Sequence, residues 1–216
     1  MMTTDVPEQL RPRILDAVMR HVPFDGWSRA AVSAAARDLG LDPGLVELAF
    51  PGGILEMIGA YADRADRQAV NGLAQCPLDR LKVRERVALA VRLRVETMVD
   101  HREAVRRALS FLSLPQHAAA GARLSWRTAD VLWRALHDPS TDFNYYSKRA
   151  ILAAVYSATV LYWLNDESDG WSETWAFLDR RIEDVMKIEK AKARVRKYAD
   201  MLPEFSRALG KMRYRG

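Results

Sequence analysis

The run from Ala150 to Leu164 contains fifteen residues, of which only Ser157 and Thr159 are polar. A helix that is apolar on every side must be buried on more than one side. At about 1.5 Å per residue, this helix is too short to cross a ~30 Å hydrocarbon layer comfortably. The run therefore predicts the central helix of a soluble domain, and its periodicity alone indicates a core helix and nothing more.

The residues that precede this run combine aromatic and charged side chains. Asp142 is a good helix N-cap, because its carboxylate can accept from free backbone N–H groups. Residues three and four apart are neighbours on a helix, so one side is expected to show an acid, two tyrosines and a guanidinium. That side carries Asp142, Tyr145, Tyr146 and Arg149, with Asn144 and Lys148 beside them, whereas Phe143 and Ser147 are expected to point elsewhere.

The remaining chain also has helical spacing of its apolar residues, with no repeat, strand alternation or low-complexity segment, so the fold class is all-α. Pro and Gly residues punctuate the helices. The expected ranges are 8–22, 28–39, 42–50, 53–71, 78–100, 102–112, 118–136, 142–166 and 171–186.

The first three of these helices predict a helix-turn-helix. Ser28 can cap the second helix, Gly40 supplies a tight turn, and Asp42 and Pro43 fit the start of a short third helix. The run ILDAVMRH…GWSRAAVSAAARDLGLDPGLVELAFPGG…LEMI resembles the N-terminal domain of TetR-type regulators. The resemblance implies a TetR-like fold, with a helical ligand-binding domain after the helix-turn-helix.

The third helix lacks the chemistry of a DNA reader. Its early residues would meet base edges in the major groove. From Asp42 to Glu47 no side chain can donate to a base or a phosphate, and from Ser28 to Phe50 the net charge is −1. DNA would repel such a surface. The helix-turn-helix is therefore predicted to be a packing scaffold that binds no nucleic acid.

The positive charge of the chain lies at its C-terminal end. Residues 187–216 hold ten Lys or Arg against three Asp or Glu, a net +7, whereas the other 186 residues carry −2. Beyond Lys187 the apolar residues fall on one helical stripe, which suits a membrane interface as well as docking on the chain's own domain. The candidate membrane-binding residues are Met201, Leu202, Phe205, Leu209 and Met212, with Lys211 and Arg213.

These features divide the chain into residues 1–52, a helix-turn-helix; 53–186, a helical ligand-binding and dimerisation domain; and 187–216, a basic amphipathic tail. Cys76 is the only cysteine, so no intrachain disulfide exists. The N-terminus lacks the apolar region of a secretory signal, and no segment reaches transmembrane length. A cytoplasmic location, or the matrix side of a mitochondrion in a eukaryote, is expected.

Catalytic and metal-binding motifs are absent from the sequence. The four histidines are far apart, and none belongs to an ExxH or HxxxH pair, so no metal site is expected. There is no GxSxG, Walker loop or GxGxxG. The chain is accordingly predicted to be no enzyme and to need no cofactor.

The stretches DFNYYSKRAILAAVYSAT and NDESDGWSETWAFLDRRIEDVM closely resemble one family, the accessory lipid-binding protein of coenzyme Q (ubiquinone) biosynthesis that is ninth in the Coq series. The likeness is dense from Asp142 to Met186. It implies a membrane-associated protein that binds an isoprenoid-quinone intermediate and presents it to the demethoxyubiquinone hydroxylase. The family's aromatic partner-binding pair falls at Tyr145 and Tyr146, and TetR-like proteins usually dimerise through their last two core helices.

Other functions are compatible with the same residues. The chain could be a TetR-type transcriptional repressor with a hydrophobic inducer, although its acidic third helix weighs against this. It could also be a structural adaptor with an empty pocket. The two tyrosines could merely pack against a neighbouring helix.

Overall fold

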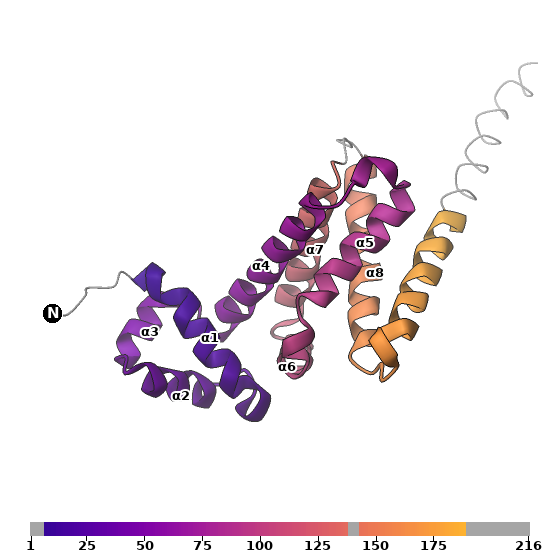
Figure 1. Cartoon of the computed structure of the whole chain (residues 1–216). Helices are drawn as coiled ribbons and strands as arrows, with labels where there is room; N and C mark the ends of the chain where they lie inside the picture. The colour runs from indigo at the N-terminus through magenta and orange to yellow at the C-terminus, as the bar shows by residue number, and fades with distance from the viewer. Residues whose placement is uncertain (1–6, 138–142, 189–216) are drawn as a thin grey trace, which may run out of the picture.

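The computed structural model describes residues 7–137 and 143–188 of the 216-residue chain. Within these ranges every regular element is a helix. Figure 1 shows a small group of helices at the N-terminal end, joined through the long helix α4 (Gly53–Ala74) to a larger helical bundle. The predicted all-α class is thus confirmed.

The N-terminal part consists of α1 (Pro7–Asp25), α2 (Arg29–Leu39) and α3 (Pro43–Ala49). Ser28 caps α2 by accepting from Ala31 N, and Asp42 caps α3 by accepting from Gly44 N. Gly40 ends α2 at φ 62°, a left-handed conformation that glycine adopts without strain. The predicted helix-turn-helix is therefore present. The first helix, predicted for 8–22 with Pro23 and Gly26 at its end, continues through Pro23 and ends at Asp25, just before Gly26.

The larger part starts with α4 (Gly53–Ala74), which is followed by a 3-10 turn, Leu78–Arg80, and by α5 (Val83–Glu96). The helix predicted for 78–100 is shorter in the structure, because the first 3-10 turn precedes α5 and a second one, Val99–His101, follows it; α6 (Arg102–Leu112) has the predicted bounds. This turn redirects the chain so that α6 can reach both α1 and α7.

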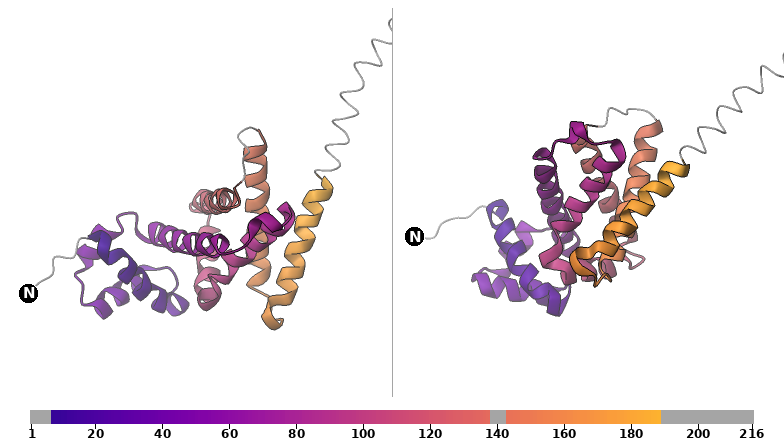
Figure 2. Two further views of the ribbon diagram at one scale, coloured as in Figure 1. Left: turned by 45° about the horizontal axis from the view of Figure 1, so that its top comes forward. Right: turned by 45° about the vertical axis from the view of Figure 1, so that its right-hand side comes forward.

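The last helices of the bundle are α7 (Ala118–Ala135), α8 (Phe143–Trp163) and, after a short 3-10 turn at Asp169–Trp171, a helix over 172–188. The two views of Figure 2 show the 172–188 helix, coloured yellow-orange, beside α8. The rings of Tyr162 and Phe177 stack at 4.6 Å between these two helices. Arg92 of α5 lies 4.9 Å from the Trp175 ring, so α5 contacts the same helix.

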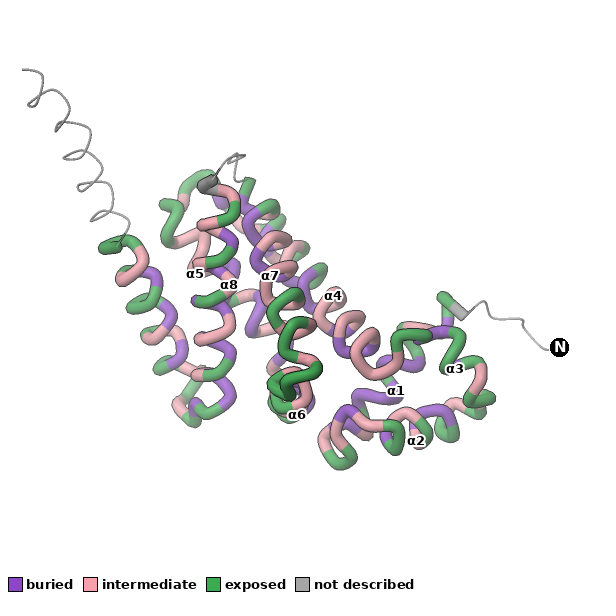
Figure 3. Tube along the Cα trace, turned by 180° about the vertical axis from the view of Figure 1, so that it is seen from behind, coloured by how far each residue is buried: buried purple, intermediate pink, exposed green. Residues whose placement is uncertain are grey.

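The α8 helix is buried on one side and exposed along a stripe on the other. Its buried side chains include Leu152, Val160 and Trp163. Leu161, however, is 56% exposed, and Ala150 and Ala154 lie on the same outer stripe. In Figure 3 the buried residues of the bundle helices face inward and the exposed residues face outward. The apolar run predicted to be buried on more than one side therefore leaves one face open.

Two arginines of α6 hold the C-terminal end of α8. Arg102 Nη2 donates to the carbonyl oxygens of Trp163 and Asp166, both at 2.6 Å, and Arg106 Nη2 donates to Leu164 O. The last carbonyl groups of a helix have no intrahelical partner and carry partial negative charge. The two guanidinium groups satisfy these carbonyls and tie α6 to α8.

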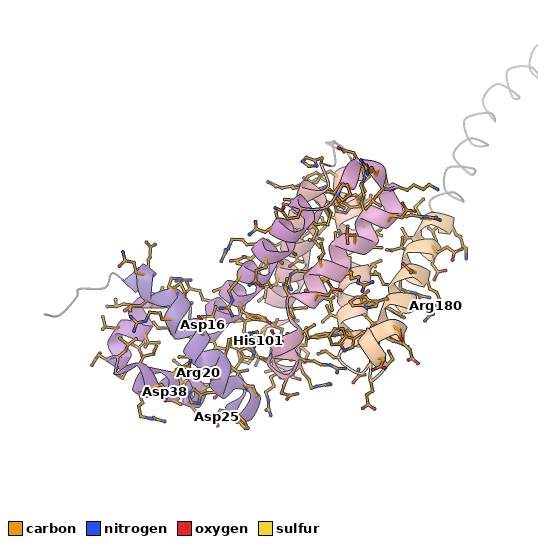
Figure 4. All side chains as sticks on the ribbon, in the orientation of Figure 1. Asp16, Arg20, Asp25, Asp38, His101 and Arg180 are labelled. Atoms are coloured by element: carbon orange, nitrogen blue, oxygen red, sulfur yellow. The ribbon has the colours of Figure 1, made fainter. Side chains whose placement is uncertain are left out.

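The two parts of the molecule meet at Trp27. Its indole N–H donates to Ala104 O of α6 at 2.9 Å, and its ring lies 6.4 Å from that of Tyr61 in α4. The His101 ring contacts Tyr61 edge-on at 5.8 Å. Figure 4 labels His101 beside α1, from which Asp16 and Arg20 project. The junction is buried and hydrogen-bonded, so it holds the small part against the bundle.

Candidate functional site

A cavity of about 360 Å³ lies among α4, α5, α6, α7 and α8. This volume is at the lower end of the ~300–1,000 Å³ range of small-molecule pockets. Apolar side chains make most of its wall, and exposed residues at the α6–α7 turn, Ser113 and Ala118, mark its mouth. Representative wall residues are Ile58, Met98, Leu109, Leu112, Leu124 and Val160. An apolar ligand would find a preformed site here.

Arg94 of α5, Thr128 of α7 and Tyr61 of α4 line a buried polar end of this cavity, which we call the polar floor, and Asp66 of α4 holds Arg94 and Thr128 from outside the lining. Arg94 is 2% exposed, and its Nε donates to Asp66 Oδ1 at 2.5 Å. The Thr128 hydroxyl donates to the same carboxylate, 3.0 Å from Oδ1. Burial favours a lower pKa for Arg94, but the neighbouring Tyr156 and Asp66 raise it. The guanidinium is therefore charged, and the carboxylate balances it.

Two donors at this floor have no partner among the described residues, the Nη1 group of Arg94 and the hydroxyl of Tyr61. Both residues line the cavity. Burial raises the pKa of Tyr61 to about 12, so its phenol keeps its proton at neutral pH. Buried polar groups are hydrogen-bonded in the great majority of proteins. The floor thus offers two O–H or N–H donors to an acceptor within the cavity.

The N-terminal half of α8 carries the predicted partner-binding residues. Tyr146 is 64% exposed and Tyr145 is half-buried, and their rings meet edge-on at 5.2 Å. The Tyr146 ring also stacks on Trp126 of α7 at 6.3 Å. The two tyrosines and Trp126 form an aromatic surface, which we call the aromatic patch.

Arg149 does not lie on that surface. It is 2% exposed, its Nε donates to Asp130 Oδ1 at 2.5 Å, and its guanidinium lies 3.3 Å from the centre of the Tyr145 ring. The Tyr145 hydroxyl donates to the same carboxylate at 2.8 Å, and Arg134 pairs with its other oxygen. Burial favours a higher pKa for Asp130, but these hydrogen bonds lower it. The exposed guanidinium predicted here is wrong, because Arg149 supports Tyr145 from inside.

The structure describes some of the other predicted site residues, whereas others lie outside the described residues. Lys148 is half-buried, with its ammonium 5.4 Å from the centre of the Trp133 ring. Asn144 is in the first turn of α8, and Asp142 lies outside the described residues. The predicted membrane-binding residues also lie outside them: Met201, Leu202, Phe205, Leu209, Lys211, Met212 and Arg213.

The polar floor is the part of the site that the sequence did not reveal. Arginines of the segment 83–96 were expected on its polar side. Arg94 nevertheless follows Val91 by three residues and precedes Met98 by four, which places it on the apolar stripe. An arginine at such a position, with Asp66 on a neighbouring helix, is the signal that could have identified the buried pair.

A second cavity of about 200 Å³ lies between α5, α8 and the 172–188 helix, lined mainly by Val87, Ile151, Val155, Ile182 and Val185.

Across the described ranges, no three His, Cys, Asp or Glu side chains gather as a metal site would require. Within the described ranges, no single helix is long and apolar enough to span a membrane. Among these described helices, only α3 and α4 taken together reach the length and hydropathy of a membrane span, and they are bent by 58° where they meet.

The family model that matches this chain is described as COQ9, and it covers residues 118–189. The chain is 32% identical over 203 residues to the ubiquinone biosynthesis protein COQ9, mitochondrial, of Homo sapiens, an alignment that covers 90% of this chain and 63% of the human protein. The COQ9 proteins of Rattus norvegicus and Drosophila melanogaster are 32% and 31% identical, with 64% and 57% of their lengths covered. The chain therefore spans a little under two thirds of the length of these relatives.

Among solved structures, a TetR transcriptional regulator from Nitrosomonas europaea superposes with a TM-score of 0.65 at 20% identity, covering 81% of this chain and 96% of the regulator. This likeness concerns the fold alone, and it confirms the predicted TetR-like architecture.

Proposed function

This chain carries the COQ9 family domain over residues 118–189 and is a relative of the COQ9 proteins along most of its length, and from that premise we propose that it serves ubiquinone biosynthesis as a lipid-binding protein. Its ligand is an isoprenoid-quinone intermediate held in the cavity between α4 and α8. The protein supplies no catalytic residue, and it presents the bound intermediate to the demethoxyubiquinone hydroxylase.

The observation that carries this proposal is the 360 Å³ cavity. Its wall is apolar apart from the floor, as suits a prenylated ring, and its volume holds the ring and the first part of a tail. A long polyprenyl chain has to continue beyond the mouth at the α6–α7 turn. The ligand can then remain partly in a membrane while its ring is bound.

The aromatic patch is the proposed contact for the hydroxylase. Tyrosine and tryptophan are among the residue types that most often carry the binding energy of an interface. The Asp130–Arg149 pair fixes Tyr145 beneath Tyr146, so little side-chain entropy is lost when a partner binds. Asp142, Asn144 and Lys148 complete the proposed contact at the start of α8.

Membrane association is proposed for the basic tail beyond Lys187, and a homodimer for the outer faces of α8 and the 172–188 helix. Leu161 and Met186 expose apolar surface on these two helices, at 56% and 40%. Symmetric dimers present the same patch from each subunit. Because Leu161 also lines the cavity, a dimer formed there would cover the α8 side of the cavity and leave the α6–α7 turn open to a membrane.

A TetR-type repressor is the second candidate, because the helix-turn-helix is present. The surface of α3 argues against it. Leu48 is 66% exposed and Leu45 is also exposed, whereas the helix offers neither arginine nor lysine to a phosphate. The helix-turn-helix is therefore proposed to be a scaffold without DNA-binding activity.

Lipid extraction and mass spectrometry of the purified protein test the proposed function. Quinone intermediates should co-purify with the natural chain and be largely lost from Ala108→Phe, which puts a ring into the cavity from α6. The matched control is Ala119→Phe, at an exposed α7 position outside the cavity lining, which should retain them. If the natural chain carries no lipid, it is a structural adaptor instead, and equal lipid in Ala108→Phe would place the binding site elsewhere.

A further inference from the structure

We propose that the polar floor of the cavity recognises the oxygen-bearing head of the ligand, with Arg94 Nη1 and the Tyr61 hydroxyl donating to neutral acceptor oxygens such as those of a quinone. This inference rests on the proposed function, since it assumes that the cavity is the ligand site. It adds to the proposed function which end of the ligand lies deepest in the cavity and which head groups the polar floor accepts.

The first argument is the satisfaction of buried donors. The described residues contain seven buried side-chain N or O atoms without a hydrogen-bond partner, and two of them, Arg94 Nη1 and Tyr61 Oη, belong to residues that line this cavity. An unsatisfied buried donor destabilises a protein. A ligand oxygen at the floor would satisfy both groups, whereas an isoprenoid tail in the same place would satisfy neither.

The second argument is the geometry that fixes the guanidinium. Nε of Arg94 is taken by Asp66 at 2.5 Å, and Nη2 lies 3.4 Å from Ala62 O. The Thr128 hydroxyl holds the Asp66 carboxylate from α7. These contacts orient Arg94 from α4 and α7 and leave Nη1 without a partner among the described residues. A donor fixed in this way loses little entropy when it binds.

The third argument concerns charge. The carboxylate of Asp66 already balances the guanidinium of Arg94, and Tyr61 and Thr128 are neutral. A ligand carboxylate at the floor would add an uncompensated buried charge, which is far more costly than a neutral acceptor. The floor therefore favours a quinone or phenol head and disfavours an early intermediate that still carries a ring carboxylate.

Tyr61→Phe is the decisive variant because it removes only a hydroxyl that has no partner among the described residues. The thermal midpoint of the ligand-free protein should stay the same or rise, since an unsatisfied buried group is lost. Binding should be measured by calorimetry with three probes: 2,3-dimethoxy-5-methyl-1,4-benzoquinone bearing one prenyl group, prenylbenzene, and 3-prenylbenzoate.

The natural chain should bind the quinone most tightly and the benzoate most weakly. Tyr61→Phe should weaken quinone binding by roughly tenfold, the size expected for one hydrogen bond, and leave prenylbenzene binding unchanged. Tyr162→Phe is the matched control, because its hydroxyl contacts Glu173 outside the cavity; it should alter neither affinity.

The outcomes separate this inference from the proposed function. If the natural chain binds the quinone and prenylbenzene but Tyr61→Phe binds both equally well, the polar floor does not read the head, while the lipid site stands. Equal affinity for the benzoate and the quinone would refute the preference for a neutral head. If the natural chain binds none of the probes, the proposed function fails as well.

Discussion

At the scale of single residues, the molecule is held together at several points by carboxylates that accept from more than one helix. Asp66 joins α4 to α5 and α7, and Asp130 joins α7 to α8 through Arg149 and Tyr145. Removing one partner of such a buried pair leaves the other charge uncompensated, at a cost of about 3–5 kcal/mol. These residues fix the functional surfaces without contacting a partner themselves.

Asp166 is a third carboxylate of this kind. It accepts from Ser168 N and Thr174 N, both at 2.8 Å, and from the Thr174 hydroxyl at 2.5 Å. Burial favours a higher pKa, but the hydrogen bonds from Ser168 and Thr174 outweigh it and lower the pKa of Asp166 to about 2. An unfolded aspartate has a pKa of about 3.9. The group therefore stabilises the fold above about pH 4.

Asp166→Asn should lower the free energy of unfolding by about 1–3 kcal/mol at neutral pH, because buried donors lose their acceptor. The difference from the natural chain should shrink as the pH falls from about 4 towards 2, where the natural carboxylate becomes protonated. Urea titrations at a series of pH values measure this difference. Asp169→Asn, an exposed acid in the same turn, serves as the control. A difference that stays constant down to pH 2 would contradict the prediction.

At the scale of elements, helix limits were predictable where one residue fixes them. Gly40 and Asp42 set the turn of the helix-turn-helix because each has a backbone or side-chain role that other residue types fill poorly. The break between α5 and α6 was expected, but the end of α5 was placed at Asp100 instead of Glu96, because the apolar spacing continues through Met98. There the Thr97 hydroxyl bonds to Arg94 O at 2.8 Å and the backbone enters a 3-10 turn.

The candidate site was predictable only in part for a related reason. The tyrosines of α8 were found from their spacing and from a family likeness, and their role in partner binding stays a prediction. The burial of Arg149 and Arg94 depends on carboxylates at Asp130 and Asp66, which are distant in the sequence. Without a structure, nothing in the local pattern pairs these charges.

The aromatic patch yields a prediction at this scale. Tyr146→Ala should weaken capture of the hydroxylase by at least about 2 kcal/mol, as loss of an interface hot spot does. Its effect on stability should stay within about 0.5 kcal/mol, since the side chain is 64% exposed. Phe24→Ala is the control, because Phe24 is an 83% exposed aromatic residue of α1 outside the aromatic patch, the cavity lining and the proposed dimer face. A pull-down with purified hydroxylase and a thermal melt measure the two effects.

Two results would contradict this assignment. Loss of capture in Phe24→Ala but not in Tyr146→Ala would move the contact to the N-terminal part of the molecule. Loss of stability in Tyr146→Ala would show that its packing on Trp126 is structural rather than a platform for a partner.

At the scale of the whole molecule, the excess positive charge and the cavity lie in different parts of the chain. The helix-turn-helix and bundle carry almost no net charge, and the basic residues gather beyond Lys187. Each Lys or Arg near an anionic surface contributes on the order of 1 kcal/mol. The tail is thus the part of the chain suited to a membrane, while the bundle carries the cavity.

A chain that ends at Arg196 should lose most of its flotation with liposomes containing anionic lipid, because it lacks the apolar stripe and five of the ten basic residues of the tail. The full chain should float well at low salt and less at high salt, since salt screens exposed charges. Liposomes of neutral lipid alone provide the control and should retain little of either protein. Equal flotation of the shortened chain would assign membrane binding to another surface.

The hydrogen bonds that join Asp66 to Arg94 and to Thr128 also affect the conformational entropy that ligand binding costs. The floor of the cavity is rigid before any ligand arrives, because three helices hold it through hydrogen bonds. The apolar wall is different, since unbranched and branched side chains such as Met98 and Leu112 can change rotamer at little cost. A rigid contact distinguishes one ligand from another, whereas an adaptable contact accepts several different ligands. Under the proposed function, such a cavity would select the chemical state of the ring and accept tails of different length.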